Sequence, residues 1–172
     1  MTRRNIPNRK DMKFLKYLIM LCVAACATYV IEGDSRIIDG DTIKVGTEKI
    51  RLTGIDAPET AQTCKCNGKK TFCGKEATQA LKDFIGDDEI FCNARKRDGY
   101  GRLLGTCFIE RNGEKIDLNR WMVQNGHAVA YRNYSKVYVP EEDEARELKK
   151  GVWACKFQMP WDYRKSKRGR KR

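Results

Sequence analysis

Apolar and polar residues alternate in two adjacent segments between residues 36 and 55, and this pattern restricts the fold more than any other feature. Ile43 and Val45 alternate with polar residues before a Gly-Thr pair, and Ile50 and Leu52 do so after it. A period of two is typical of half-buried strands, and a glycine-containing turn between two such segments predicts a β-hairpin. The chain must therefore bury one face of a sheet against other elements.

The remaining sequence mixes helices with further antiparallel strands. The pattern predicts helices over residues 75–85, around 118–126 and over 141–150, strands over 89–96 and 102–109, a tight turn at 112–113, and a short extended segment over 128–131. Residues 56–74 are polar and rich in Cys, Gly and Lys, which predicts a surface loop. This order of elements predicts an α+β fold in which helices pack against a small barrel.

The chain has 172 residues, 41% of them hydrophobic and 34% charged, which is enough for one core and one domain. Its net charge of +12 lies at the two ends, because residues 1–31 contribute +5 and residues 164–172 contribute +7. The body between them is neutral, so the bulk charge does not identify a binding site. The basic tail over residues 164–172 is interpreted either as a salt-sensitive grip on nucleic acid or as a disordered, solubilising tail.

The N-terminal segment has the shape of a signal peptide. A basic stretch over residues 1–16 precedes 15 uncharged residues, and Ala25-Cys26-Ala27 offers small residues at the spacing used for cleavage. Two alternatives stay open, namely acylation of Cys26 in a lipobox-like sequence and an uncleaved signal anchor. We therefore interpret residues 1–27 as a signal peptide or membrane-anchoring segment and predict an extracytoplasmic protein, either secreted or periplasmic, or tethered to a membrane.

Six cysteines remain after this segment, and an even number in a small exported domain predicts disulfides. Cys92 and Cys107 lie symmetrically about the turn of the second predicted hairpin, so we predict that they pair. The cluster of Cys64, Cys66 and Cys73 can supply one internal bond and one that reaches Cys155; Cys64 and Cys73 are among the candidates, and the assignment stays open. A zinc site is the alternative, although the spacing lacks paired C-x-x-C motifs.

Carboxylates interrupt the first predicted hairpin at its ends. Asp39-Gly40-Asp41-Thr42 precedes one strand, and Asp56-Ala57-Pro58-Glu59 follows its partner, so four acids can converge at one end of the hairpin. Clustered carboxylate oxygens suit a hard cation. Arg51 lies between the two acidic segments and Arg102 follows the second hairpin turn, and guanidinium groups bind phosphate oxygens. Together these residue types predict hydrolysis of a phosphodiester.

Three motifs in this sequence resemble those of the staphylococcal nuclease (thermonuclease) family, in its exported bacterial form. They are Asp39-Gly40-Asp41-Thr42, the segment from Arg51 to Glu59, and Asp98-Gly99-Tyr100-Gly101-Arg102. The resemblance extends from about residue 37 to residue 153, and we assign residues 33–163 to a nuclease domain. It implies a five-stranded OB-type barrel with about three helices, a single Ca²⁺ ion, and endonucleolytic cleavage of DNA and RNA that leaves 3′-phosphate ends.

The same resemblance implies a role for individual residues. Asp41 and Asp56 are implied to bind calcium together with the backbone carbonyl of Ala57, which stands where the best-known member has Thr. Glu59 is implied to be a general base or to orient the attacking water. Asp39 is implied to shape the turn or to lie behind the metal ligands. Arg51 and Arg102 are implied to hold the phosphate and stabilise its transition state; Tyr131 and Tyr134 resemble nucleotide-contacting tyrosines, although packing in the barrel explains them equally well.

Two other classes of function are weighed against this one. A domain of this fold that only binds nucleic acid needs no complete set of acids and arginines, whereas this chain retains them all. A structural calcium-binding protein explains the acids but gives Arg51 and Arg102 no role. The single histidine, His127, is interpreted as structural, and we expect a monomer with no obligate protein partner.

Overall fold

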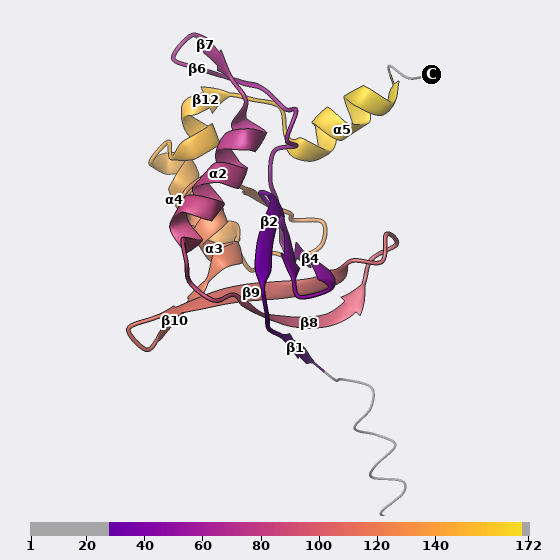
Figure 1. Ribbon diagram of the computed structural model, residues 1–172. Helices are drawn as coiled ribbons and strands as arrows, with labels where there is room; N and C mark the ends of the chain where they lie inside the picture. The colour runs from indigo at the N-terminus through magenta and orange to yellow at the C-terminus, as the bar shows by residue number, and fades with distance from the viewer. Residues whose placement is uncertain (1–27, 170–172) are drawn as a thin grey trace, which may run out of the picture.

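A computed structural model describes residues 28–169 of this protein. The predicted N-terminal signal or anchor segment over residues 1–27 lies outside the described residues. The described part is an α+β fold in which a mixed sheet packs against helices (Figure 1). No helix within residues 28–169 is long and apolar enough to cross a membrane.

The main sheet has seven strands in the order β1-β8-β9-β4-β3-β2, with β10 paired to the far part of β9. Strands β4 and β9 run parallel, and the other neighbours run antiparallel. The strands are β1 (Tyr29–Ile31), β2 (Ser35–Asp39), β3 (Thr42–Val45), β4 (Glu48–Leu52), β8 (Phe91–Arg97), β9 (Leu103–Arg111) and β10 (Glu114–Asp117).

The α+β class is confirmed, but the described strands do not close into the expected five-stranded barrel. The path of pairings within residues 28–169 runs from β1 to β2 and stays open, because β1 covers the outer edge of β8 while β2 pairs only with β3. A separate pair joins β5 (Ile55–Asp56) to β11 (Val129–Ala130). This pair carries the chain away from the main sheet directly after β4, where the second acidic segment begins.

Both predicted hairpins are confirmed. In the first, β3 and β4 pair directly around the Gly46-Thr47 turn, and Gly46 has a positive φ of 55° that suits glycine. In the second, β8 and β9 pair around the turn at residues 98–102. Side chains along β9 alternate strictly between buried and partly exposed over its first seven residues, as a sheet with one covered face requires.

Four α-helices lie within the described residues: α2 (Cys73–Ile85), α3 (Leu118–Gln124), α4 (Val139–Glu147) and α5 (Pro160–Gly169). A 3₁₀ helix, η2, covers Gly151–Ala154. In Figure 1, α2, α3 and α4 group on one side of the strands, and α5 stands apart from them at the upper right. The three predicted helices correspond to α2, α3 and α4, with ends shifted by a few residues.

The fourth helix, α5, differs from the sequence prediction. The sequence predicts the boundary between domain and basic tail at residue 163, which lies inside this helix. Pro160 suits the first turn of a helix because it has no N–H to leave unpaired, Asp162 lies near the positive N-terminal end, and Lys167 and Arg168 lie near the C-terminal end. The start of the predicted tail is therefore helical through Gly169.

The core lies between the main sheet and helices α2 and α3. The sheet contributes Ile43, Ile50 and Ile109, and the helices contribute Leu81 and Met122, all of them fully buried. Burying a side chain of this size contributes about 1.5–3 kcal/mol relative to leaving it in water. The core thus fixes α2 and α3 against the strands that bear the acidic motifs.

Three disulfides link the six cysteines of the described part. Cys92 and Cys107 are directly opposite on β8 and β9, as predicted from their symmetric positions about the hairpin turn. The other two bonds join Cys64 to Cys73 and Cys66 to Cys155. The expected internal and long-range bonds of the cluster are thereby resolved, and disulfide pairing replaces the zinc alternative for these cysteines.

The segment over residues 56–74 was predicted to be an irregular surface loop, and this prediction is wrong in part. It contains the short hairpin of β6 (Cys64–Cys66) and β7 (Lys69–Thr71), and β12 (Cys155–Lys156) joins it as a third strand. The strands are only three residues long, so alternation gave no recognisable signal. The two cluster disulfides hold them to α2 and to β12.

His127 is expected to make the stability of the protein depend on pH. Burial lowers the pKa of its imidazole, whose ring lies 5.3 Å from that of Trp121. An unfolded chain protonates this side chain near pH 6.5, whereas the folded protein resists protonation. The contribution of His127 is thus complete above about pH 6.5 and declines as the pH falls toward its lower folded pKa.

Urea unfolding between pH 5 and pH 8 measures this effect. His127→Gln should flatten the slope below pH 6.5, since the chain contains no other histidine. An unchanged slope in that variant would show that other groups cause the pH dependence.

Candidate active site

The two acidic segments meet because the backbone approaches closely at Gly40. A Cβ atom at this position would lie 2.7 Å from the Cβ of Ala57 and 3.3 Å from that of Ala77 on α2. Only glycine allows this approach without displacing its neighbours. The Asp39 carboxylate accepts a hydrogen bond of 3.0 Å from the backbone N–H of Asp41, which shapes the same turn. Burial raises the pKa of the Asp39 carboxyl, in spite of Thr42 and the nearby arginines, which act to lower it.

Asp41 and Asp56 face the same guanidinium group. Asp41 is 3% exposed and Asp56 is fully buried. Arg51 on β4 donates from Nη1 to Asp41 Oδ1, and from Nη2 to Asp56 Oδ1 at 2.7 Å. The second oxygen of Asp41 accepts a hydrogen bond of 2.9 Å from the backbone N–H of Ala57. The predicted convergence of these residues is therefore present in the structure.

Glu59 lies at the edge of this cluster, and its backbone is fixed by α2. A Cβ atom on Gly74 would lie 1.8 Å from the carbonyl oxygen of Glu59, so the start of α2 packs directly on this peptide. The backbone N–H of Glu59 donates to Oε1 of Gln62 at 3.2 Å, and Gln62 is fully buried. The Glu59 side chain itself is 41% exposed. A rigid backbone thus presents a carboxylate that solvent and substrate can reach.

Arg102 is oriented by Asp98 from the same turn. Its Nε donates to Asp98 Oδ2 at 2.8 Å, and its Nη1 reaches Thr42 Oγ1 at 3.5 Å. Asp98 also accepts backbone N–H bonds from Tyr100 and Arg102. Burial acts to raise the pKa of Asp98, but these hydrogen bonds outweigh it and lower the pKa below its usual value. Asp98 belongs to the third motif, and its orienting contact with Arg102 was not predicted.

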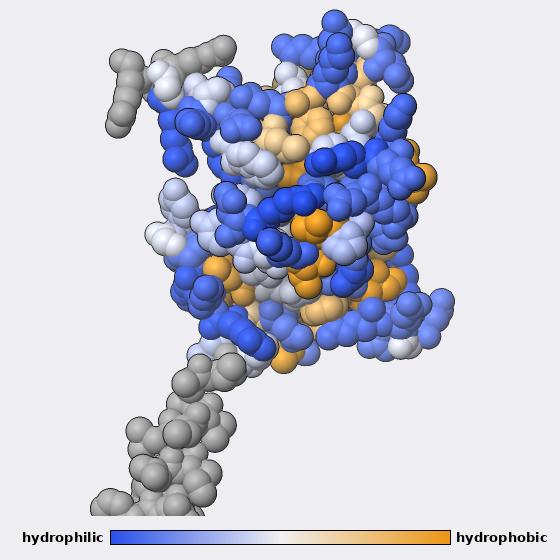
Figure 2. All heavy atoms as spheres, turned by 180° about the vertical axis from the view of Figure 1, so that it is seen from behind, coloured by the Kyte–Doolittle hydropathy of each residue, from blue (hydrophilic) through white to orange (hydrophobic). Residues whose placement is uncertain are grey.

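These residues open into one cleft of about 820 Å³. The volume lies within the range of ordinary ligand sites. In Figure 2, which shows the molecule from behind, the cleft opens as a notch at the left edge between α5 and the turn after β8. Both acidic and basic residues line it. The acidic ones are Asp39, Asp41, Glu59 and Asp98, and the basic ones are Lys49, Arg51, Lys96, Arg102, Arg164 and Arg168.

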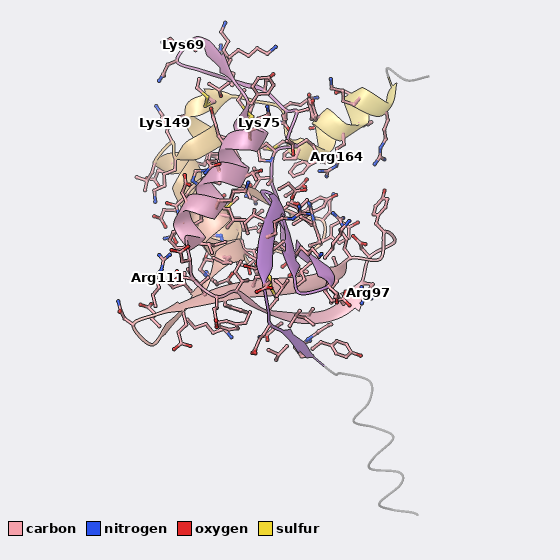
Figure 3. The ribbon with its side chains drawn as sticks, viewed as in Figure 1. Lys69, Lys75, Arg97, Arg111, Lys149 and Arg164 are labelled. Carbon is pink, nitrogen blue, oxygen red and sulfur yellow. A yellow bond between two sulfur atoms is a disulfide. The ribbon has the colours of Figure 1, made fainter. Side chains whose placement is uncertain are left out.

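Arg164 contributes to this site, although its position in the sequence predicts a residue of the basic tail. It extends from α5 toward the strands (Figure 3) and donates three hydrogen bonds, to Asp56 Oδ1 at 2.9 Å, Asp56 Oδ2 at 2.8 Å and Glu59 Oε1 at 2.8 Å. The bonds to Asp56, joined by that to Glu59, raise the pKa of Arg164. The Pro at residue 160 and the acid at 162 were the available signals for a helix.

Tyr131 and Tyr134 both line the cleft, as the nucleotide-contacting interpretation requires. Their ring centroids are 4.7 Å apart, and Tyr134 is 78% exposed. Tyr131 also lies parallel to Trp161 of α5, at 5.6 Å between centroids and 4° between planes. Trp161 is not among the residues that line the cleft, and its contact with Tyr131 was not predicted.

The donor chemistry of the cluster fits a hard cation. Asp41 and Asp56 offer buried carboxylate oxygens that a single positively charged group already bridges, and Ala57 places a backbone carbonyl between Asp56 and Pro58. Within residues 28–169, no group of three or more His, Cys, Asp or Glu side chains has the geometry of a formed metal centre. A cation in this cluster would have the carboxylates of Asp41 and Asp56 available as ligands.

Comparison with known proteins agrees with this arrangement. The family described as "Staphylococcal nuclease homologue" matches residues 49–155. The chain is 36% identical to "Succinoglycan biosynthesis protein ExoI" of Rhizobium meliloti (strain 1021), in an alignment that covers 81% of this chain and 72% of that protein. It is 32% identical to "Protein ParB" of Escherichia coli, with 93% and 98% covered.

A third relative is named for an activity. The chain is 35% identical to "Micrococcal nuclease" of Shigella flexneri, with 86% of this chain and 88% of that protein covered. The family match spans more than half of the chain and includes Arg51, Asp56, Glu59 and Arg102. The chain therefore belongs to the staphylococcal nuclease family, and it is a nuclease that hydrolyses phosphodiester bonds.

Proposed function

We propose that this nuclease is a calcium-dependent endonuclease that cleaves both DNA and RNA and leaves 3′-phosphate ends. The observation that carries the proposal is that Asp41, Glu59, Arg51 and Arg102 line one open cleft, with the buried Asp56 bonded to Arg51 beside it. Carboxylates that can bind a cation and activate water thus lie beside guanidinium groups that can bind a phosphate.

Glu59 is the residue proposed to activate water. Its partly exposed carboxylate accepts a proton from a water molecule whose oxygen attacks the phosphorus. The bond from phosphorus to the 5′ oxygen then breaks, and that oxygen takes up a proton from solvent, to which Glu59 returns the proton that it accepted. The products are a 3′-phosphate end and a 5′-hydroxyl end.

Arg51 and Arg102 are proposed to stabilise the additional negative charge on the phosphate oxygens during this step. Asp98 keeps the Arg102 guanidinium in place through its own carboxylate. Arg51 and Arg164 donate to Asp56 in the structure, and these guanidinium groups would be available to a phosphate if a cation bound to that carboxylate. Fixed, partly buried donors of this kind act more strongly than they do in water.

Calcium bound by Asp41, Asp56 and the carbonyl of Ala57 supplies Lewis-acid polarisation of the phosphate and a template for the substrate. Such a hard cation prefers the oxygen ligands that this cluster offers. The proposal therefore assigns the buried pair of carboxylates to metal binding and leaves the exposed Glu59 for proton transfer.

The protein is proposed to act outside the cytoplasm as a monomer without an obligate protein partner. Three disulfides support this location, because oxidising compartments maintain them. Secretion, a lipid anchor at Cys26 and an uncleaved signal anchor all concern residues outside the described part. Membrane fractionation before and after Cys26→Ser separates a lipid anchor from the other two.

Digestion of plasmid DNA and single-stranded RNA by the purified protein tests the activity. We expect both substrates to be degraded with added Ca²⁺ and protected by EGTA. We expect labelled fragments to carry 3′-phosphate, which blocks extension by a polymerase until a phosphatase removes it. Binding without cleavage in Ca²⁺ and in Mn²⁺ would instead identify a nucleic-acid-binding domain, and fragments with 3′-hydroxyl ends would contradict the proposed bond.

A further inference from the structure

The small sheet of β6, β7 and β12 carries a row of three lysines. Lys65 on β6 lies directly opposite Lys70 on β7 and, on its other side, directly opposite Lys156 on β12. All three residues are exposed. Residues that are directly opposite on neighbouring antiparallel strands point to the same face of a sheet, so the three ammonium groups lie side by side. One face of this sheet is therefore positively charged.

The other face of the same sheet is covered. Successive side chains of a strand alternate between faces, and Cys64 and Cys66 on either side of Lys65 therefore lie opposite to it. They form the disulfides with Cys73 and Cys155, and a small apolar cluster packs around these four cysteines. Strands of three residues gain little stability from their own pairing, so the disulfides and the cluster hold the sheet in place. The row of lysines thus has a fixed position and faces solvent.

The charge of this row is not balanced by acids nearby in the sequence. Residues 60–75 contain four lysines and no Asp or Glu. Within residues 28–169, the only lysine that forms an ion pair is Lys150, with Glu144. Like charges that lie directly opposite each other on neighbouring strands destabilise a sheet. The row therefore costs stability in the free protein, and an anion bound across it relieves the repulsion.

The row continues through a hollow to the far side of α5. Lys70 lines this hollow of about 420 Å³ together with Lys167 of α5 and the hydroxyl-bearing residues Thr63 and Ser166. Arg164 of the same helix lines the catalytic cleft instead. In Figure 1 the small sheet lies at the top, beside the start of α5, whereas the turn after β8, which borders the cleft, lies below that helix. A polyanion that leaves the cleft past α5 therefore meets these lysines.

The length of the row suits a nucleic-acid backbone. Neighbouring strands lie about 4.8 Å apart, so Lys70 and Lys156 are separated by about 10 Å at their backbones. One strand of DNA carries a phosphate about every 3.4 Å along the helix axis, so the row matches the length of about three phosphates. Lysine binds phosphate as a flexible point charge. A phosphodiester backbone is therefore the polyanion that this surface fits.

We propose that Lys65, Lys70 and Lys156, extended by Lys167, form a second nucleic-acid-binding surface outside the catalytic cleft, which binds the phosphate backbone of the substrate beyond the point of cleavage. The surface binds without regard to base sequence, because phosphate contacts carry no direct sequence information. This inference rests on the proposed function only in taking nucleic acid as the substrate, and it does not depend on the identity of the metal.

Lysine acetylation in the presence of DNA locates the surface. The full chain carrying Glu59→Gln is acetylated in EDTA, with and without a DNA duplex of about 30 base pairs, about ten times the length that the row covers. Mass spectrometry measures the modification of each lysine. The three lysines of the row should be protected several-fold by the duplex. Lys82 and Lys115 are exposed and line neither the hollow nor the cleft, so they should be modified equally in both samples.

Fluorescence anisotropy of the labelled duplex measures the contribution of the row to affinity. In the same background, Lys65→Gln/Lys70→Gln should weaken binding and reduce the slope of log K against log salt by about 1.8, which is about 0.9 for each lost phosphate contact. Lys82→Gln/Lys115→Gln is the matched control, because it removes the same charge elsewhere, and it should leave the slope nearly unchanged. Lys65→Arg/Lys70→Arg keeps the charge and should keep the affinity. The thermal midpoint of the first variant should not fall, since the substitution removes a like-charge repulsion.

Equal effects of the two glutamine variants would overturn the inference, because net charge alone would then explain binding. Equal acetylation of the row with and without DNA would overturn it as well. Loss of binding to phosphatidylglycerol vesicles with unchanged binding to DNA would assign the surface to a membrane and also overturn it. If the unmutated chain does not digest nucleic acid but the row is protected by DNA, the proposed function fails while the inference stands; digestion without protection gives the reverse.

Discussion

Replacement of Glu59 by Gln is expected to lower kcat by about 10²- to 10⁴-fold, the range associated with the loss of a general base. The amide keeps the shape of the side chain and an oxygen that can still accept the hydrogen bond from Arg164, so the contact between α5 and the cluster survives. It no longer accepts a proton from the attacking water. Because the Glu59 side chain is 41% exposed, the substitution leaves no buried group without a partner.

Single-turnover digestion of a labelled oligonucleotide in Ca²⁺ measures this loss directly. Glu114→Gln on the exposed start of β10 removes the same charge away from the cleft and should keep the activity of the unmutated protein. The thermal midpoints of both variants show whether the fold is intact. Turnover of Glu59→Gln close to that of the unmutated protein would reject Glu59 as the base and leave the exposed carboxylates of the cleft to be tested in turn.

Removal of the disulfide between Cys66 and Cys155 is expected to lower the free energy of unfolding by about 4.6 kcal/mol, because this bond closes a loop of 89 residues. The bond between Cys64 and Cys73 closes only nine, for which the same chain-entropy relation gives about 2.6 kcal/mol. Both bonds hold the same small sheet. A comparison of the two double variants therefore separates the effect of loop length on the free energy of unfolding from the effect of the local environment. A loss of several kcal/mol is a large part of the stability of a single domain.

Urea unfolding without reductant compares Cys66→Ala/Cys155→Ala with Cys64→Ala/Cys73→Ala. The first variant should be the less stable, even though Cys64 and Cys73 are the more deeply buried pair. An equal or smaller loss for the long-range bond would mean that the unfolded chain is compact enough to make its cross-link ineffective. Titration of the unmutated chain with a thiol reagent should find none of these six cysteines free.

The first hairpin shows how much of the fold could be predicted from the sequence. Alternation at Ile43, Val45, Ile50 and Leu52 reports which residues face the core, because successive side chains of a strand point to opposite faces. The pairing of Cys92 with Cys107 could be predicted for a related reason, since both residues lie at similar distances along the chain from the same hairpin turn. The hairpin of β6 and β7 was not readable, because its strands are too short to show a period.

The part of the candidate site whose residues belong to continuous motifs could also be predicted. Four of its residues, Asp41, Arg51, Glu59 and Arg102, lie in or beside the predicted strands and line one cleft. The fifth, Asp56, is buried beside them and bonded to Arg51. Their individual roles stay predictions until the variants are measured. The sequence did not indicate Arg164, because the first residue of a basic segment has the same local sequence whether its side chain is solvated or bound.

The sequence by itself determined the α+β class, the two main hairpins, the cluster of acids with arginines, and the disulfide across β8 and β9. Each depends on interactions between residues that are close along the chain or related by one turn. Only the tertiary structure decided that Cys66 pairs with Cys155 and that Arg164 reaches Asp56, from which it is separated by 108 positions. Contacts at such separation depend on how the whole core directs the chain in space, and no local pattern of side chains encodes that path.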